Sequence, residues 1–135
     1  MDEIYLPRQL FQEMVAHLVE QLPDEACGLV GGQDRRATCH YPVENILHNP
    51  VAFEMEPLQQ IRAMLAIEAE GLELLAIYHS HPSGPARPSP SDVAQAYYPD
   101  AAQIIISLAD PARPAARAFM IQDGWVREIA LKVGE

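Results

Sequence analysis

Two short and almost entirely apolar runs, residues 72–78 (LELLAIY) and 103–109 (QIIISLA), constrain the fold more than any other feature of the sequence. A strand that is apolar at successive positions is typical of the buried, central strands of α/β proteins. These runs therefore predict the middle of a β-sheet on which helices pack. The chain of 135 residues has the length of a single domain, residues 1–135.

Helical spacing of apolar residues is found over residues 7–22 and again over residues 57–70. Pro7 suits the first turn of the first helix, and Gly71 is typical of the end of the second. A third helix is expected over residues 90–98. In the second helix we expect four apolar residues to face the core: Leu58, Ile61, Met64 and Leu65.

The remaining strands are predicted by shorter apolar runs and by turn signals. Residues 25–32 (EACGLVGG) and 37–43 predict two strands. Asp123-Gly124 is a strong hairpin signal between strands over residues 115–122 and 125–133. The fold class is therefore α/β, with a mixed β-sheet of about five to six strands packed with two to three helices.

The charge and cysteine content exclude several classes of protein. Acidic residues outnumber Lys and Arg by 19 to 9, so the formal net charge is −10. This balance argues against nucleic acid and anionic membrane as partners, because both need a basic surface. The sequence contains no run of 18 apolar residues, which is the length needed to span a bilayer. With only Cys27 and Cys39 and no secretory leader pattern, we expect a cytoplasmic protein, although a disulfide between these cysteines stays open.

Residues 79–92 (HSHPSGPARPSPSD) hold the densest group of potential metal ligands. His79 and His81 lie two apart after an extended run, so both imidazoles point to the same side. Four prolines stiffen the loop that follows and predict an arc that returns Asp92 to the histidines. Two histidines and one carboxylate leave the fourth tetrahedral position open for water, as in a catalytic zinc site.

The residues alone also allow a second interpretation of this segment. A His-x-His pair is more often a solvent-exposed pair or part of a core than a metal site. The stiff loop favours a metal site, as does a helix start with Ser89 as N-cap, Pro90 as first residue and Asp92 as third. On this evidence the two interpretations are about equally supported.

The segment resembles the signature of the JAMM (MPN-plus) metalloprotease family. That signature is an upstream glutamate, then His-Ser/Thr-His, seven residues, Ser, two residues and Asp. In this sequence the corresponding residues are Glu25, His79, Ser80, His81, Ser89 and Asp92. Small bacterial and archaeal members, among them peptidases of sulfur-carrier proteins, are similar in length and element order from the first helix to about residue 107. The family's architecture is related to that of cytidine deaminases.

The resemblance implies a zinc metallopeptidase with one Zn²⁺ per chain. His79, His81 and Asp92 would bind the zinc. Glu25 would act as general base and then as general acid, and Ser89 would donate a hydrogen bond to the oxyanion. Without the motif, Glu25 would be interpreted as a surface acid.

The resemblance also implies a substrate class, which is a ubiquitin-like or sulfur-carrier protein with a Gly-Gly C-terminus. Cleavage would follow the last glycine, and release of an attached amino acid such as cysteine is one form of it. We expect loop 44–56 and arc 83–88 to wall the groove for such a tail, and a homodimer is compatible with the sequence. The alternative is a non-catalytic MPN-type interaction scaffold, although scaffold members lack the ligands present here. A zinc deaminase would need a His-x-Glu and a Cys-x-x-Cys, which the chain lacks.

Several other polar residues have roles that the sequence leaves open. Cys27 would share a face with Glu25 in an extended segment, and we expect it to be a small buried residue under the site rather than a nucleophile. His48 could reach the cleft from its loop. Four further expectations are a solvent-exposed His17, a loop or edge His40, and core positions for Tyr78 and Trp125.

Overall fold

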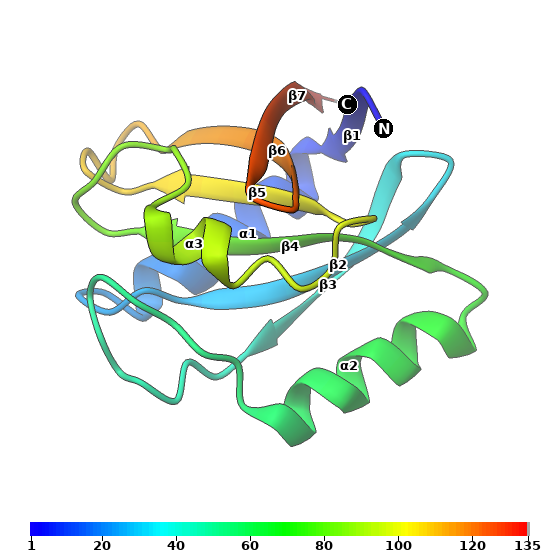
Figure 1. Ribbon diagram of the computed structural model, residues 1–135, viewed down its shortest axis with the longest axis horizontal. Helices are drawn as coiled ribbons and strands as arrows, with labels where there is room; N and C mark the ends of the chain where they lie inside the picture. Colours follow the sequence, from blue (N-terminus) through cyan, green and yellow to red (C-terminus); the bar gives the residue numbers. More distant parts are fainter. Residues whose placement is uncertain (135) are drawn as a thin grey trace.

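The computed structural model describes residues 1–134 and folds them into a seven-stranded barrel with three helices (Figure 1). The elements are β1 (Glu3–Pro7), α1 (Arg8–Glu20), β2 (Cys27–Gln33), β3 (Arg36–Val43), α2 (Pro57–Ala69), β4 (Glu73–His81), α3 (Pro90–Ala94), β5 (Ala102–Ser107), β6 (Ala115–Gln122) and β7 (Trp125–Gly134). Around the barrel the strands follow the order β1-β3-β2-β4-β5-β6-β7. The α/β class and the mixed sheet are confirmed, whereas the expected five to six strands are too few.

The strand missing from the prediction is β1, which closes the barrel. It pairs in parallel with β7 from Glu3 opposite Ala130 to Pro7 opposite Gly134, so the two ends of the chain lie side by side (Figure 1). Only Ile4 and Leu6 are buried in β1, which is too short an alternation to identify a strand. Its partner β7 lies at the far end of the sequence, so no local sequence pattern predicts the pairing.

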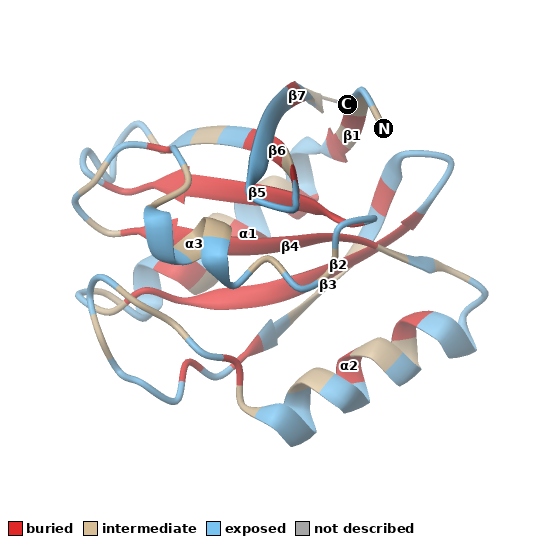
Figure 2. Cartoon of the chain, viewed as in Figure 1, coloured by how far each residue is buried: buried red, intermediate tan, exposed pale blue. Residues whose placement is uncertain are grey.

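β4 lies between β2 and β5 in the barrel wall and is buried on both faces from Leu75 to His81 (Figure 2). Tyr78 points into the large core cluster that includes α1, whereas Ile77 points into a second cluster under α2. The buried strand is confirmed, but it runs to His81, three residues beyond the apolar run 72–78. Because side chains alternate along a strand, His79 and His81 lie on the face of Ile77.

The buried side of α2 differs from the prediction. The helix packs on β2 and β4 through Ala63 and Ile67, which lie one turn apart. Gly31 of β2 allows this close approach, because a Cβ there would lie 3.0 Å from Ile67 Cγ1. Apolar residues surround much of this helix, so their spacing cannot select the buried stripe. Of the four expected core residues, Met64 is half-buried, but three are more than half exposed: Leu58, Ile61 and Leu65.

The hydroxyl group of Tyr78 lies between two histidines. His17 Nδ1 is 2.9 Å and His40 Nδ1 is 3.1 Å from this oxygen, which can donate to one ring and accept from the other. The core position of Tyr78 is confirmed, whereas the expectation of a solvent-exposed His17 is wrong. Burial lowers the pKa of both histidines. The expectation that Trp125 lies in the core is also wrong, because Trp125 follows the hairpin turn and is 81% exposed.

α3 is shorter than expected and ends at Ala94. The chain then leaves the helix and brings Tyr98 beside α2, where its hydroxyl accepts a hydrogen bond from Gln60 (3.3 Å). Cys27 and Cys39 are free thiols. Within residues 1–134, the helices are too short or too polar to cross a membrane.

We expect Gly28→Ala to destabilise the fold, because Gly28 of β2 lies against the ring of Tyr78. A Cβ at this position would lie 2.5 Å from two ring atoms. Admitting the methyl group should lower the free energy of unfolding by about 1–3 kcal/mol. Gly84→Ala is the control, since a Cβ there meets no atom within 4 Å. Chemical denaturation of both variants tests the close contact, which equal stabilities would contradict.

Candidate active site

Three potential metal ligands converge where β4 ends and α3 begins. The Nε2 atoms of His79 and His81 lie 3.1 Å apart, and Asp92 Oδ2 lies 3.3 Å and 3.1 Å from them. Ligands at about 2.0–2.1 Å from a tetrahedral zinc ion are about 3.3 Å apart. In residues 1–134 no other three His, Cys, Asp or Glu side chains bring ligand atoms within 4.8 Å of one another. The donor atoms therefore fit one ion with little adjustment.

The surroundings orient the two imidazoles. The carbonyl of Pro85 lies 2.8 Å from His81 Nδ1 and accepts its proton, which leaves the Nε2 lone pair for a metal. The ring of Phe53 lies 4.6 Å from that of His79, centroid to centroid. Burial lowers the pKa of His79 despite the neighbouring Asp92. This keeps His79 neutral, which is the form that binds metals.

Ser89 and Asp92 hold each other in a capping box at the start of α3. Ser89 Oγ accepts from the Asp92 amide (3.0 Å), and the Ser89 amide donates to Asp92 Oδ2 (2.9 Å). Burial raises the pKa of Asp92, but the adjacent imidazoles of His79 and His81 and the Ser89 amide together lower it well below its usual range. Asp92 is therefore a carboxylate at neutral pH. The Ser89 hydroxyl proton is not used by the cap and can be donated elsewhere.

Glu25 lies just before β2, which begins at Cys27. The predicted strand over residues 25–32 had included Glu25, so its start is corrected. Its side chain is buried, and Oε1 has no hydrogen-bond partner within residues 1–134. Burial raises the pKa of this carboxyl to about 7; His81 opposes the shift and Asp92 adds to it. A carboxyl that titrates near neutral pH is suited to accept a proton and to return it.

Three residues to which the sequence assigns no role hold the backbone at Glu25 and Ala26. The Glu25 amide donates to the Asn49 carbonyl (2.9 Å). Asn45 Nδ2 donates to the Glu25 carbonyl (2.9 Å). Ser80, between the two histidines, accepts from the Ala26 amide (2.9 Å) and donates its own amide to the Ala26 carbonyl (3.0 Å). Ser80 therefore ties the strand of the histidines to the segment of Glu25. Its place within the His-x-His motif was a signal, but its partner lies 54 residues away.

Asn45 also organises the loop of residues 44–56. Its Nδ2 donates to the Ala52 carbonyl (3.1 Å), and its Oδ1 accepts from the amides of Leu47 (3.0 Å) and Glu54 (3.1 Å). The side chain is buried, so these bonds replace those that water would provide. The long loop is thus an ordered part of the site.

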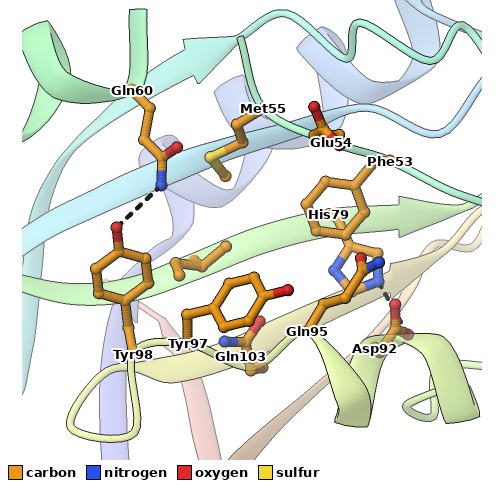
Figure 3. A pocket seen from close by; sticks show the side chains of 11 residues that line it. Phe53, Glu54, Met55, Gln60, His79, Asp92, Gln95, Tyr97, Tyr98 and Gln103 are labelled. Atoms are coloured by element: carbon orange, nitrogen blue, oxygen red, sulfur yellow. Dashed lines mark hydrogen bonds and ion pairs between the residues drawn. The ribbon is translucent and has the colours of Figure 1, made fainter. Parts of the chain in front are cut away.

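Two grooves meet at the converging ligands. The first, here called the apolar groove, has a volume of about 230 Å³ and ends at His79 and Asp92 (Figure 3). Its apolar and aromatic walls are Phe53, Met55, Ile77, Tyr97 and Tyr98.

The second, here called the proline groove, has a volume of about 550 Å³, and Glu25, His81 and Ser89 are among the residues that line it. Loop 44–56 contributes to both grooves, and the arc 83–88 contributes most of its residues to the wall of the proline groove. Both expected wall segments therefore border the site.

Cys27 and His48 stand apart from the ligand group. Cys27 is fully buried, and its Sγ lies 3.4 Å from the Val43 carbonyl. Burial raises the pKa of this thiol to about 12, which keeps it protonated and unsuited to nucleophilic attack. His48 lies in the exposed loop, 3.6 Å from the Glu44 carboxylate, and borders a separate hollow beside Glu25.

Comparison with known proteins shows a matching family and several relatives. The family described as prokaryotic homologs of the JAB domain matches residues 7–122. The chain is 40% identical over 131 residues (96% of this chain, 82% of the relative) to a probable TtuB-protein conjugate cleaving protease of Thermus thermophilus. It is 36% identical over 128 residues (93% and 88%) to a CysO-cysteine peptidase of Mycobacterium tuberculosis. The solution structure of protein DSY2949 from Desulfitobacterium hafniense has 38% identity and a TM-score of 0.89, covering 98% of this chain and 93% of that one.

The chain belongs to this JAB-domain family, as a small prokaryotic JAMM member. It is a hydrolase of the metallopeptidase class. The resemblance drawn from the motif is confirmed, and the alternative of a non-catalytic scaffold loses its support.

We expect Asn45→Asp to slow turnover without removing the metal. Aspartate keeps the acceptor oxygen but cannot donate to the Glu25 carbonyl. Leaving that buried carbonyl unpaired should cost about 1–3 kcal/mol, and we expect turnover to fall at least about tenfold. Asn49→Asp is the matched control. The side chain of Asn49 serves only as an acceptor, for the Val51 amide, and the contact of Asn49 with the Glu25 amide is made by its main-chain carbonyl, which the substitution keeps. Elemental analysis and turnover of both variants test this role, and equal turnover would contradict it.

Proposed function

We propose that this protein is a zinc-dependent peptidase that cleaves the amide bond after the C-terminal glycine of a ubiquitin-like or sulfur-carrier protein. The observation that carries the proposal is the convergence of His79, His81 and Asp92 beside the buried carboxyl of Glu25. Imidazole and carboxylate donors in a tetrahedral arrangement suit zinc. Two relatives support the substrate class, since one is named for cleaving a TtuB-protein conjugate and the other for CysO-cysteine.

The chain's own residues divide the chemistry of hydrolysis. A zinc ion held by the three ligands would lower the pKa of its water to about 7 and polarise the scissile carbonyl. Glu25, whose Oε1 has no other partner within residues 1–134, accepts the proton of the attacking water. It then returns that proton to the leaving amine. Ser89, fixed by the capping box, donates its hydroxyl proton to the developing oxyanion.

The apolar groove suits the tail of the carrier. We expect its aromatic walls to leave a narrow approach to His79 and Asp92, where glycine lets the backbone come closest. Gln60 links this groove to α2, whose exposed apolar side offers a surface for the folded body of the carrier. Such substrates and the two free thiols suit a cytoplasmic enzyme.

The proposed substrate class predicts a strong preference for Gly-Gly tails. The test uses ubiquitin-like carriers that end in Gly-Gly, Ala-Ala or Val-Val, each extended by one residue, with mass spectrometry of the products. We expect cleavage of the Gly-Gly form only, since side chains would obstruct approach to the ligands. Equal cleavage of all three would contradict the narrow approach, and cleavage of none would contradict the proposed function.

The donor geometry predicts one zinc per chain. We expect protein purified without chelator to hold one zinc, and His81→Ala to lose it while keeping most of its helix and strand content. His48→Ala is the control, because His48 lies outside the ligand group. Elemental analysis with circular dichroism decides the point, and a folded wild type without metal would refute the zinc site.

Glu25→Gln should retain zinc and lose nearly all turnover. The amide cannot accept the water's proton, and loss of a general base costs about 10²–10⁴ in rate. Ser89→Ala should also lower turnover and, by removing the N-cap, stability by about 1 kcal/mol. Glu20→Gln, an exposed acid on α1, is the control. Turnover of Glu25→Gln within about tenfold of wild type would exclude Glu25 as the base.

A further inference from the structure

The positions of the two grooves indicate where the leaving group lies. In the proposed mechanism Glu25 returns a proton to the leaving amine, so that amine must be on the side of Glu25. Glu25 borders the proline groove and the separate hollow near His48, and it is absent from the walls of the apolar groove. Of the two spaces beside Glu25, only the proline groove also contains a candidate metal ligand, His81. With the glycine tail in the apolar groove, the leaving group occupies the proline groove. This step rests on the proposed function.

Arg87 is the one Lys or Arg side chain among the residues that line the proline groove. The ion pairs within residues 1–134 involve other cations and leave Arg87 without a carboxylate partner: they occupy Arg35, Arg117, Arg127 and Lys132. The groove also contains the carboxyl of Glu25, and the chain carries a formal charge of −10. A carboxylate that enters this groove without a cationic partner would be disfavoured by these negative charges. The guanidinium of Arg87, which has no other carboxylate partner within residues 1–134, can be that cation.

The backbone of Arg87 is held in place by the arc on either side of it. Its amide donates to the Pro85 carbonyl (2.8 Å), and Ala86 is buried against Ile105 and Phe119. The same arc accepts a hydrogen bond at the Gly84 carbonyl from the Ser107 hydroxyl (2.6 Å). The exposed side chain therefore projects from a fixed base, and little ordering of the main chain is needed for binding.

The distances along the chain allow Arg87 to reach a small leaving group. Arg87 precedes Ser89 by two residues, so their Cα atoms are at most about 7 Å apart. In an amino acid joined to glycine through its α-amine, the carboxyl carbon lies about 2.5 Å from the leaving nitrogen. A guanidinium and a carboxylate match as a planar pair with two parallel hydrogen bonds.

We propose that Arg87 binds the free α-carboxylate of the leaving group, and that the enzyme is thereby specific for a single amino acid attached to the carrier's glycine. A lysine side chain in a protein conjugate leaves through its ε-amine and brings no carboxylate to this position. Hydrolysis adds the water hydroxyl to the glycyl carbon and breaks the C–N bond. The proton taken by Glu25 goes to the nitrogen, and the amino acid leaves with its carboxylate intact.

The test compares three leaving groups on one ubiquitin-like carrier that ends in Gly-Gly. These are alanine with a free carboxylate, alaninamide, and the ε-amine of an Nα-acetyl-lysine amide, each made by semisynthesis. We measure kcat/KM for the wild type, Arg87→Gln, Arg87→Lys and Arg8→Gln. Arg8 is an exposed arginine of α1 that borders neither groove, and it is the matched control.

We expect the wild type to cleave the free-acid substrate about tenfold or more faster than the other two, the effect of one charge-assisted contact. The ratio of acid to amide should approach one in Arg87→Gln, be partly kept in Arg87→Lys and stay unchanged in Arg8→Gln. A structural role for Arg87 would lower all three rates equally and would overturn the proposal, as would a wild-type ratio near one. In both cases the carrier is still cleaved, so the proposed function stands. A wild type that cleaves none of the substrates would overturn that function and this inference with it.

Discussion

The burial of β4 on both faces determines where the candidate ligands lie. Tyr78 fills the core on the side of α1, and Ile77 fills the core under α2, so the strand cannot rotate. Parallel pairing with β5 extends this order to the end of β4, where His79 is opposite Ile105 and His81 is opposite Ser107. A slip of one residue would move Tyr78 onto the ligand face and both histidines into the core. The site is therefore an extension of the core packing.

Beyond the end of β4, hydrogen bonds replace apolar packing as the source of order. The capping box of Ser89 and Asp92, the Pro85 carbonyl and the Ser80 hydroxyl each fix one part of the site. Two buried atoms of the site are exceptions, because Glu25 Oε1 and His79 Nδ1 have no hydrogen-bond partner within residues 1–134. An unpaired buried oxygen costs about 1–3 kcal/mol, so this fold accepts some loss of stability for a carboxyl that is free to take up a proton.

The parts of the site that depend on local spacing could be predicted from the sequence. His79 and His81 are two apart on a strand, and Asp92 is three residues after an N-cap, so their geometry follows from short-range rules. The same holds for the hairpin and for most of the helix and strand positions. The strand β1 and the supports from Asn45 and Ser80 could not be predicted, because each depends on a partner far away in the sequence.

The exposed residues of α2 and Trp125 mark the limit of apolar spacing as evidence for a core. Leu58, Ile61 and Leu65 have helical spacing, yet the sheet accepts the smaller Ala63 with Ile67, because Gly31 brings the two layers close together. A sequence pattern reports that a surface is apolar and not what covers it. The proposed substrate is another protein, and the uncovered apolar side of α2 lies beside the apolar groove. Burial of this apolar side against the carrier would follow the same rule as burial in a core.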